Sequence, residues 1–257
     1  MFAKALFSAA TVAILVSAQT AEQKKMYSSW SGTIGIWGYD WEPHKVVTDD
    51  GYTLTLMHVT KKSGPFHKKP DTSMAPILVV SPMGSNPHSW LATGLSNSPP
   101  TNPMLLQLRD AGHDMWFNYS RGTEYSLEHD QYAPDSKEFW DFSWEQMGTG
   151  DVRASLDYIY TATEQKVGLI GFSMGTTQIF AAMSLDYENF YKDRTYKVVQ
   201  LAPCTITAKD QYAPFNMATV NALNAAGIFE IGGPTWYLTV VKIREVLGIK
   251  LLQGFLD

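Results

Sequence analysis

The sequence has one cysteine and no run of basic residues, and each scarcity excludes a class of protein. With Cys204 as the only thiol, no disulfide forms within the chain, and a lone cysteine in an apolar context is expected to be packed. The formal net charge is −5 with charges of both signs scattered, which excludes nucleic acid as a partner because its binding needs a basic patch. The sequence also lacks the H-E-x-x-H, C-x-x-C and P-loop patterns, so it predicts no metal and no cofactor.

The N-terminal segment contains an apolar run that is short for a membrane span. Lys4 precedes the mostly apolar residues 5–16, and Val16-Ser17-Ala18 ends in a small-residue cleavage pattern, so a signal peptide is predicted over 1–18. A span needs about 20 apolar residues, more than this segment offers. We therefore expect a secreted protein or one of the lysosomal or vacuolar lumen. An organelle-targeted protein with an uncleaved N-terminus is the alternative.

The rest of the sequence alternates short apolar runs with helical patterns. Strands are expected at 46–48 and 53–59 around the turn Asp49-Asp50-Gly51, and then at 77–80, 113–117, 167–170 and 196–201. Helices are expected at 103–111, 151–163 and 176–185, the first with Asn102 as N-cap and Gly112 as its stop. This alternation predicts an α/β fold with a mostly parallel sheet wrapped by helices.

One pentapeptide carries the chemistry. Gly171-Phe172-Ser173-Met174-Gly175 fits G-x-S-x-G between a predicted strand and a predicted helix. A serine in that position sits on a strained turn, at a helix N-terminus whose dipole favours developing negative charge. The two glycines are needed where a Cβ would collide with neighbouring backbone. Ser173 is therefore the candidate nucleophile, and a tight turn with a merely structural serine is the alternative.

Further segments follow one another along the chain in a recognisable order. They are residues 41–54, Asp114-Met115-Trp116, Ser120-Arg121-Gly122, Tyr125-Ser126, His129, residues 139–148, residues 171–177 and Leu201-Ala202-Pro203. In this order they resemble the acid lipase family, which includes gastric and lysosomal acid lipases. The resemblance covers about residues 30–205. It implies a partial α/β-hydrolase core over 19–210 and the start of a helical cap over 211–257, without the last strands and most of the cap.

The same resemblance implies an oxyanion hole formed by the backbone N–H groups of Met83 and Met174. The family has His-Gly-Leu where this sequence has Ser81-Pro82-Met83. Proline has no N–H, but the donor position is that of Met83. In the nucleophile motif, Phe172 and Met174 replace residues that are usually polar, which leaves the backbone N–H of Met174 as the second donor.

The histidines all precede the candidate nucleophile. In this fold an Asp and then a His follow the serine, whereas residues 174–257 contain no histidine. The resemblance implies that the chain ends within the cap, before the strands that carry both residues. His88, in the loop after the strand predicted at 77–80, is the candidate for a replacement base. His129 is expected to be structural. Surface or hairpin positions are expected for His44, His58 and His67.

Two functions from different classes follow. One is a lipase-type carboxylic ester hydrolase of lipid catabolism, acting on neutral lipids such as triacylglycerols or sterol esters, with Asp and His supplied from outside this chain. The other is a catalytically inactive lipase-fold protein that serves as a binding or structural subunit. The open sheet edge at 196–201 predicts that a C-terminal half, a protein partner, or a membrane or lipid surface covers it. Without a base, we expect no measurable esterase activity from the chain alone.

Overall fold

A computed structural model describes residues 27–62, 73–83, 85–92, 100–205 and 225. The predicted signal peptide over 1–18, His67, and all of the predicted cap over 211–257 except Ala225 lie outside these ranges. No helix in the described ranges is both long and apolar enough to cross a bilayer.

The described strands form one mixed sheet. They are β1 (Tyr39–Val47), β2 (Tyr52–Lys62), β3 (Ile77–Val80), β4 (Met115–Tyr119), β5 (Glu128–His129), β6 (Val167–Phe172) and β7 (Thr195–Leu201). The order across the sheet is β1-β2-β4-β3-β6-β7, with β5 paired to β2. Strands β4, β3, β6 and β7 are parallel, and the β1–β2 hairpin joins them through an antiparallel β2–β4 pair. The predicted hairpin and the predicted α/β class are confirmed.

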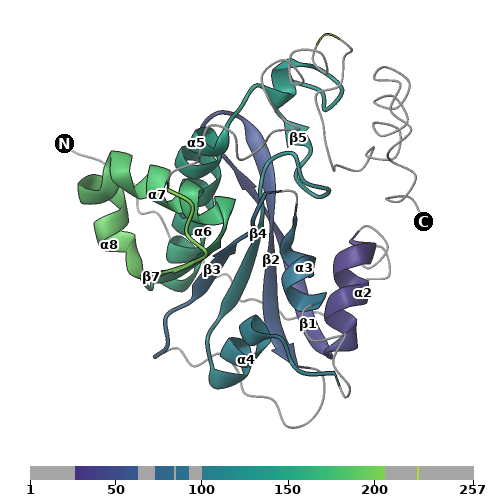
Figure 1. The fold of residues 1–257 in the computed structure, drawn as a ribbon. Helices are drawn as coiled ribbons and strands as arrows, with labels where there is room; N and C mark the ends of the chain where they lie inside the picture. The colour runs from purple at the N-terminus through teal and green to yellow at the C-terminus, as the bar shows by residue number, and fades with distance from the viewer. Residues whose placement is uncertain (1–26, 63–72, 84, 93–99, 206–224, 226–257) are drawn as a thin grey trace, which may run out of the picture.

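Helices cover both faces of this sheet, as Figure 1 shows. On one face lie α2 (Ser28–Ile36), α3 (Pro87–Ala92) and α4 (Met104–Ala111). On the other lie α5 (Trp144–Gln146), the π-helix η2 (Met147–Val152), α6 (Arg153–Thr163), α7 (Met174–Asp186), the π-helix η3 (Tyr187–Tyr191) and α8 (Lys192–Arg194). The short helix η1 (Glu138–Trp140) contributes Phe139 to a separate small cluster with Tyr52 and Leu54.

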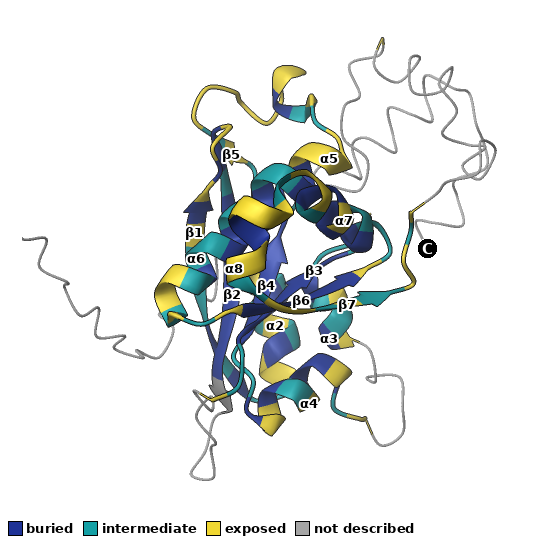
Figure 2. Ribbon diagram, turned by 90° about the vertical axis from the view of Figure 1, so that its left-hand side faces the viewer, coloured by how far each residue is buried: buried dark blue, intermediate teal, exposed yellow. Residues whose placement is uncertain are grey.

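An apolar core lies on each face of the sheet, and β3 contributes to both. Ile77 and Val79 belong to the core beneath α2, α3 and α4, whereas Leu78 and Val80 belong to the core beneath α6 and α7. Successive side chains of a strand point to opposite faces, so a strand with only apolar residues is buried on both sides. Figure 2 shows the central strands in the colour of buried residues. The doubly buried strand predicted at 77–80 is confirmed.

Several predicted boundaries differ from the structure. The predicted N-cap Asn102 is wrong: the N-cap of α4 is Pro103, and no side chain caps it. The Asn102 amide donates instead to Asp110 Oδ2, 3.0 Å away near the other end of the same helix. Gly112 does end α4, with a φ of 121° that favours glycine. Strand β4 begins two residues later than predicted, and α7 begins two residues earlier, directly after Ser173.

Candidate active site

Ser173 occupies the turn between β6 and α7, as predicted. Its φ of 51° and ψ of −120° lie outside the usual regions for a residue with a Cβ, a conformation that costs on the order of 1–3 kcal/mol. Backbone contacts hold it there: Ser173 N donates to Leu201 O at 3.0 Å, and Thr176 N donates to Ser173 O at 2.9 Å. The Thr176 hydroxyl also donates to Ser173 O, at 2.5 Å. The neighbouring strand β7 and the first turn of α7 therefore both stabilise the strained turn.

Backbone contacts require a glycine at position 175, whereas Gly171 is crowded mainly by side chains. A Cβ on Gly175 would lie 2.9 Å from Ser81 O and even closer to Val80 O, both of them backbone atoms. A Cβ on Gly171 would lie 2.8 Å from Gln200 Oε1 and 3.0 Å from the Gly175 carbonyl carbon. Helix α7 thus begins in direct contact with the carboxyl end of β3. This close approach confirms, for Gly175, the predicted collision of a Cβ with neighbouring backbone.

The two predicted oxyanion residues follow neighbouring parallel strands. Met174 is the first residue of α7, directly after the β6 turn, and Met83 lies three residues beyond the end of β3. Open α/β sheets bind ligands at the carboxyl ends of their strands, where both residues are found. The edge is apolar as well: the Met83 side chain is exposed, and the Phe172 ring centroid lies 5.4 Å from that of Trp90.

Cys204 also lies at this edge, a position that the sequence analysis missed. Its Sγ lies 3.9 Å from Ser173 Oγ, its backbone N donates to Thr176 Oγ1 at 2.9 Å, and its carbonyl accepts from Thr177 Oγ1 at 2.7 Å. The available signal was its place three residues after β7, because carboxyl ends of adjacent parallel strands meet at one edge. The thiol therefore contacts the candidate nucleophile, whereas the sequence analysis expected only packing.

His88, the predicted replacement base, has a carboxylate partner. Its Nδ1 lies 3.6 Å from Glu124 Oε1, which also accepts a hydrogen bond from Ser29 Oγ at 2.7 Å. Burial alone raises the pKa of Glu124, but the contact with His88 and the hydrogen bond from Ser29 outweigh burial and hold that pKa below its usual value. Among the described residues, no histidine hydrogen-bonds Ser173 Oγ. The structure therefore places His88 in a His–Glu pair without joining it to the nucleophile.

The remaining described histidines have structural surroundings. His129 Nδ1 accepts hydrogen bonds from the backbone of Gln131 and Tyr132, which fits the structural role predicted for it. His44 and His58 lie in the β1–β2 hairpin, as expected, and His58 is buried there, at 7% exposed. Burial, helped by the nearby His58, lowers the pKa of His44 to about 4.

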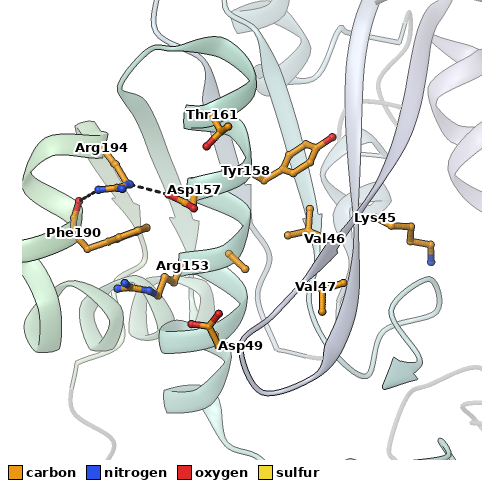
Figure 3. A pocket seen from close by; sticks show the side chains of 12 residues that line it. Lys45, Val46, Val47, Asp49, Arg153, Asp157, Tyr158, Thr161, Phe190 and Arg194 are labelled. Atoms are coloured by element: carbon orange, nitrogen blue, oxygen red, sulfur yellow. Dashed lines mark hydrogen bonds and ion pairs between the residues drawn. The ribbon is translucent and has the colours of Figure 1, made fainter. Parts of the chain in front are cut away.

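A cavity of about 570 Å³ lies between β1, α6 and η3, on the face of the sheet that α6 covers (Figure 3). Two arginines line it, and each is paired: Arg194 Nε lies 2.8 Å from Asp157 Oδ1, and Arg153 Nη1 lies 2.5 Å from Asp186 Oδ2. None of the residues 171–175 lines this cavity. We therefore assign it no part in the chemistry of Ser173.

Comparisons with known proteins find lipases among the relatives of this chain. A family model described as a partial alpha/beta-hydrolase lipase region matches residues 31–94. Mouse gastric triacylglycerol lipase is 36% identical over 162 residues, which cover 60% of this chain and 38% of that protein. Mouse lipase member K is 30% identical over 222 residues, which cover 86% of this chain and 53% of that protein. These matches support an assignment of the chain to the acid lipase family.

The chain spans about half the length, or less, of the curated relatives it matches. Among solved structures it is similar to an alpha/beta hydrolase from Novosphingobium aromaticivorans, with a TM-score of 0.38 at 16% identity. That alignment covers 62% of this chain and 43% of the other. The sheet order and the strand–serine–helix turn are those of the α/β-hydrolase fold, which the sequence analysis predicted.

Proposed function

We propose that the chain is the nucleophile-bearing part of a lipase-type carboxylic ester hydrolase that acts on neutral lipids, triacylglycerols or sterol esters. The observation that carries the proposal is the strained turn at Ser173, which stands between a buried parallel strand and a helix N-terminus. A backbone outlier of this kind persists only where its surroundings enforce it, and such outliers cluster at active sites. The names of the relatives supply the class of substrate.

In this proposal Ser173 Oγ attacks the ester carbonyl, and the backbone N–H groups of Met83 and Met174 stabilise the oxyanion. The contact between Gly175 and the carbonyl oxygens of Val80 and Ser81 supports this pairing, because it brings the segment that leads to Met83 against the start of α7. Loss of one such donor in an enzyme of this type typically costs about 2.7–4 kcal/mol of transition-state stabilisation.

The acid and the histidine of the triad would come from outside residues 1–257, on the same polypeptide or on a second one. The proposal retains the expected division into a core over 19–210 and a cap region over 211–257. It also retains a secreted protein, or one of the lysosomal or vacuolar lumen, with the signal peptide removed after Ala18. A C-terminal half, a protein partner or a lipid surface would cover the edge strand β7, where Tyr196 is 57% and Val199 48% exposed.

Two measurements on the 257-residue chain test the role of Ser173. One is hydrolysis of a short-chain 4-nitrophenyl ester, and the other is covalent labelling by a fluorophosphonate, located by peptide mass spectrometry. We expect no measurable turnover and slow labelling confined to Ser173. The label should disappear in Ser173→Ala and persist in Ser184→Ala, a matched change on the same helix α7.

The outcomes separate the two functions. A folded chain that is never labelled at Ser173, or ester hydrolysis that persists in Ser173→Ala, would rule out this serine as the nucleophile. The first of these results, together with binding of a lipid ester, would establish the inactive binding subunit instead. Turnover that disappears in Ser173→Ala would support the lipase and refute only the expectation that the chain alone is inactive.

A further inference from the structure

Three side chains with metal-binding atoms converge on the β1–β2 hairpin, which two strands, β4 and β3, separate from β6 and Ser173 in the sheet order. Glu42 and His44 are alternate residues of β1 and therefore point to the same face of the sheet. His58 on β2 is the direct cross-strand partner of Glu42. A carboxylate oxygen of Glu42 and one ring nitrogen of each histidine all lie within 4.8 Å of one another. Among the described residues, this is the group that satisfies such a distance requirement.

Each histidine has one ring nitrogen in use and one without a hydrogen-bond partner. His58 Nε2 lies 2.6 Å from Asp114 Oδ1, and His44 Nδ1 lies 2.8 Å from the Tyr158 hydroxyl. The other nitrogens, His58 Nδ1 and His44 Nε2, are buried and have no hydrogen bond. The nearest Glu42 oxygen is 3.8 Å from His44 Nε2, too far for a hydrogen bond. Buried nitrogens left unbonded are costly, and a ligand that accepts their lone pairs would remove that cost.

The partners of the bonded nitrogens are those that orient metal-binding histidines. A carboxylate that accepts the other N–H fixes the tautomer, leaves the lone pair on the free nitrogen, and raises the basicity of the ring. Asp114 has this relation to His58, and the Tyr158 oxygen can accept from His44 in the same way. The His58 ring is further held by a parallel stack on Trp116, with centroids 3.9 Å apart and planes 3° apart. Trp116 Nε1 in turn donates to Asp114 Oδ2 at 2.8 Å.

We propose that Glu42, His44 and His58 form a binding site for a divalent transition-metal ion of the zinc class, held through His44 Nε2, His58 Nδ1 and the Glu42 carboxylate. Two imidazoles and one carboxylate match the ligand preferences of Zn²⁺, which is usually four-coordinate, so that a water would complete the site. Imidazole nitrogens disfavour Mg²⁺ and Ca²⁺, which take oxygen ligands. The sequence pattern predicts no metal because these ligands are assembled across two strands rather than at one local spacing.

The geometry requires only a small adjustment for an ion. Zinc–ligand bonds of about 2.1 Å in a tetrahedron place the ligand atoms roughly 3.4 Å apart. A Glu42 oxygen and one ring nitrogen of each histidine lie within 4.8 Å of one another, so shifts of about 1 Å bring such atoms to this spacing. The Glu42 and His44 side chains supply this freedom and an entry path, since they are 19% and 20% exposed, whereas His58 is fixed by its stack and its carboxylate.

The position of the site indicates a stabilising role. The ion would join β1 to β2, and through His44 and Tyr158 it would also connect the hairpin to α6. Strands β4 and β3 separate this hairpin from β6 and the turn at Ser173, so the ion would not contact the reacting atoms. A ligand that binds only the folded state raises the free energy of unfolding in proportion to the logarithm of its concentration. We therefore expect zinc to raise the thermal midpoint of the chain.

The test uses the 257-residue chain after removal of metals with a chelator. Zn²⁺ affinity is measured by competition with a chromophoric chelator, and Co²⁺ provides the visible absorption of a nitrogen–oxygen ligand set. We expect one ion per chain, a thermal midpoint that rises with Zn²⁺, and no competition from Mg²⁺. Glu42→Gln and His44→Gln should each lower the Zn²⁺ affinity at least tenfold, and both sites are exposed enough for the chain to fold.

Two controls make the result specific. His113→Gln alters another part-buried histidine, whose Nδ1 pairs with Ala75 O, and it should leave the affinity unchanged. Cys204→Ala removes the only thiol and should also leave it unchanged. Absence of Zn²⁺ binding by the folded chain would overturn the proposal. So would unchanged binding in both Glu42→Gln and His44→Gln, loss of binding in Cys204→Ala, or equal competition by Mg²⁺.

Discussion

Replacing Asp151 by asparagine perturbs the buried ion pair that anchors η2 next to helix α7. Asp151 accepts two hydrogen bonds from Arg121: its Oδ2 from the backbone N at 2.8 Å and its Oδ1 from Nε at 2.7 Å. Both side chains are fully buried. Helix η2 in turn contacts α7 so closely that a Cβ on Gly148 would lie 3.2 Å from the Gln178 carbonyl carbon. Loss of the pair therefore affects the support of the turn at Ser173 as well as global stability.

The magnitude follows from the difference in burial between the two acids that contact Arg121. Removing one partner of a buried pair costs about 3–5 kcal/mol because the other charge stays buried. Asp50 accepts from Nη1 and Nη2 at 2.6 and 2.9 Å and still neutralises part of the guanidinium charge. We therefore expect Asp151→Asn to lower the free energy of unfolding by about 3 kcal/mol, at the lower end of that range. Asp50 is 46% exposed, so Asp50→Asn should cost about 1 kcal/mol or less.

Urea unfolding followed by near-UV circular dichroism measures both variants. Burial raises the pKa of Asp151 to about 6, against the opposing charge of Arg121, so measurement near about pH 8 keeps the carboxyl ionised. A loss of about 3 kcal/mol corresponds to a fall in thermal midpoint of about 6–12 °C for a domain of this size. Equal losses in the two variants, or a loss in Asp151→Asn below about 1 kcal/mol, would contradict the assignment of stability to the buried pair.

Three further changes test the turn, the acid dependence and the thiol. Gly175→Ala inserts a Cβ against backbone, so it should lower the free energy of unfolding by about 1–3 kcal/mol and abolish fluorophosphonate labelling. Gly32→Ala, which has open space around the new Cβ, should do neither. Urea midpoints and labelling of both variants test this. Burial raises the pKa of Asp50, but hydrogen bonds and charge from its guanidinium partner outweigh it and keep that pKa below the usual value. The ionised Asp50 carboxylate therefore stabilises the fold above its unfolded-state pKa, and this stabilisation is lost as pH falls through its folded-state pKa. Urea midpoints should therefore decline less between about pH 6 and pH 3 in Asp50→Asn than in the wild type. Identical slopes would refute this. Alkylation of Cys204 with N-ethylmaleimide should block fluorophosphonate labelling of Ser173, because Cys204 Sγ lies 3.9 Å from Ser173 Oγ. Unchanged labelling of the alkylated chain would show that the thiol does not lie in the path of the probe.

The sequence was informative where one local pattern dictates structure. The apolar run 77–80 and the turn Asp49-Asp50-Gly51 were placed correctly, because strand periodicity and turn chemistry act over a few neighbouring residues. The N-cap was predicted wrongly: Pro103 takes that position, and the Asn102 side chain directs its NH2 group to Asp110 while its Oδ1 accepts no hydrogen bond, an orientation that depends on how the loop approaches the helix. Helix α6 begins later than predicted, since residues Met147–Val152 form a π-helix that periodicity does not reveal.

At the candidate site, too, some features follow from the local sequence and others only from the tertiary structure. The amino-acid sequence by itself determined the α/β class and the strained turn at Ser173, since both follow from patterns within a few residues and, at Gly175, from a glycine that backbone contact demands. Only the tertiary structure decided that Cys204 lies against the nucleophile, that His88 pairs with Glu124, and that Glu42 meets both hairpin histidines. These contacts join residues far apart in the sequence or on neighbouring strands. They depend on strand order, register and side-chain direction, which the packing of the whole sheet sets.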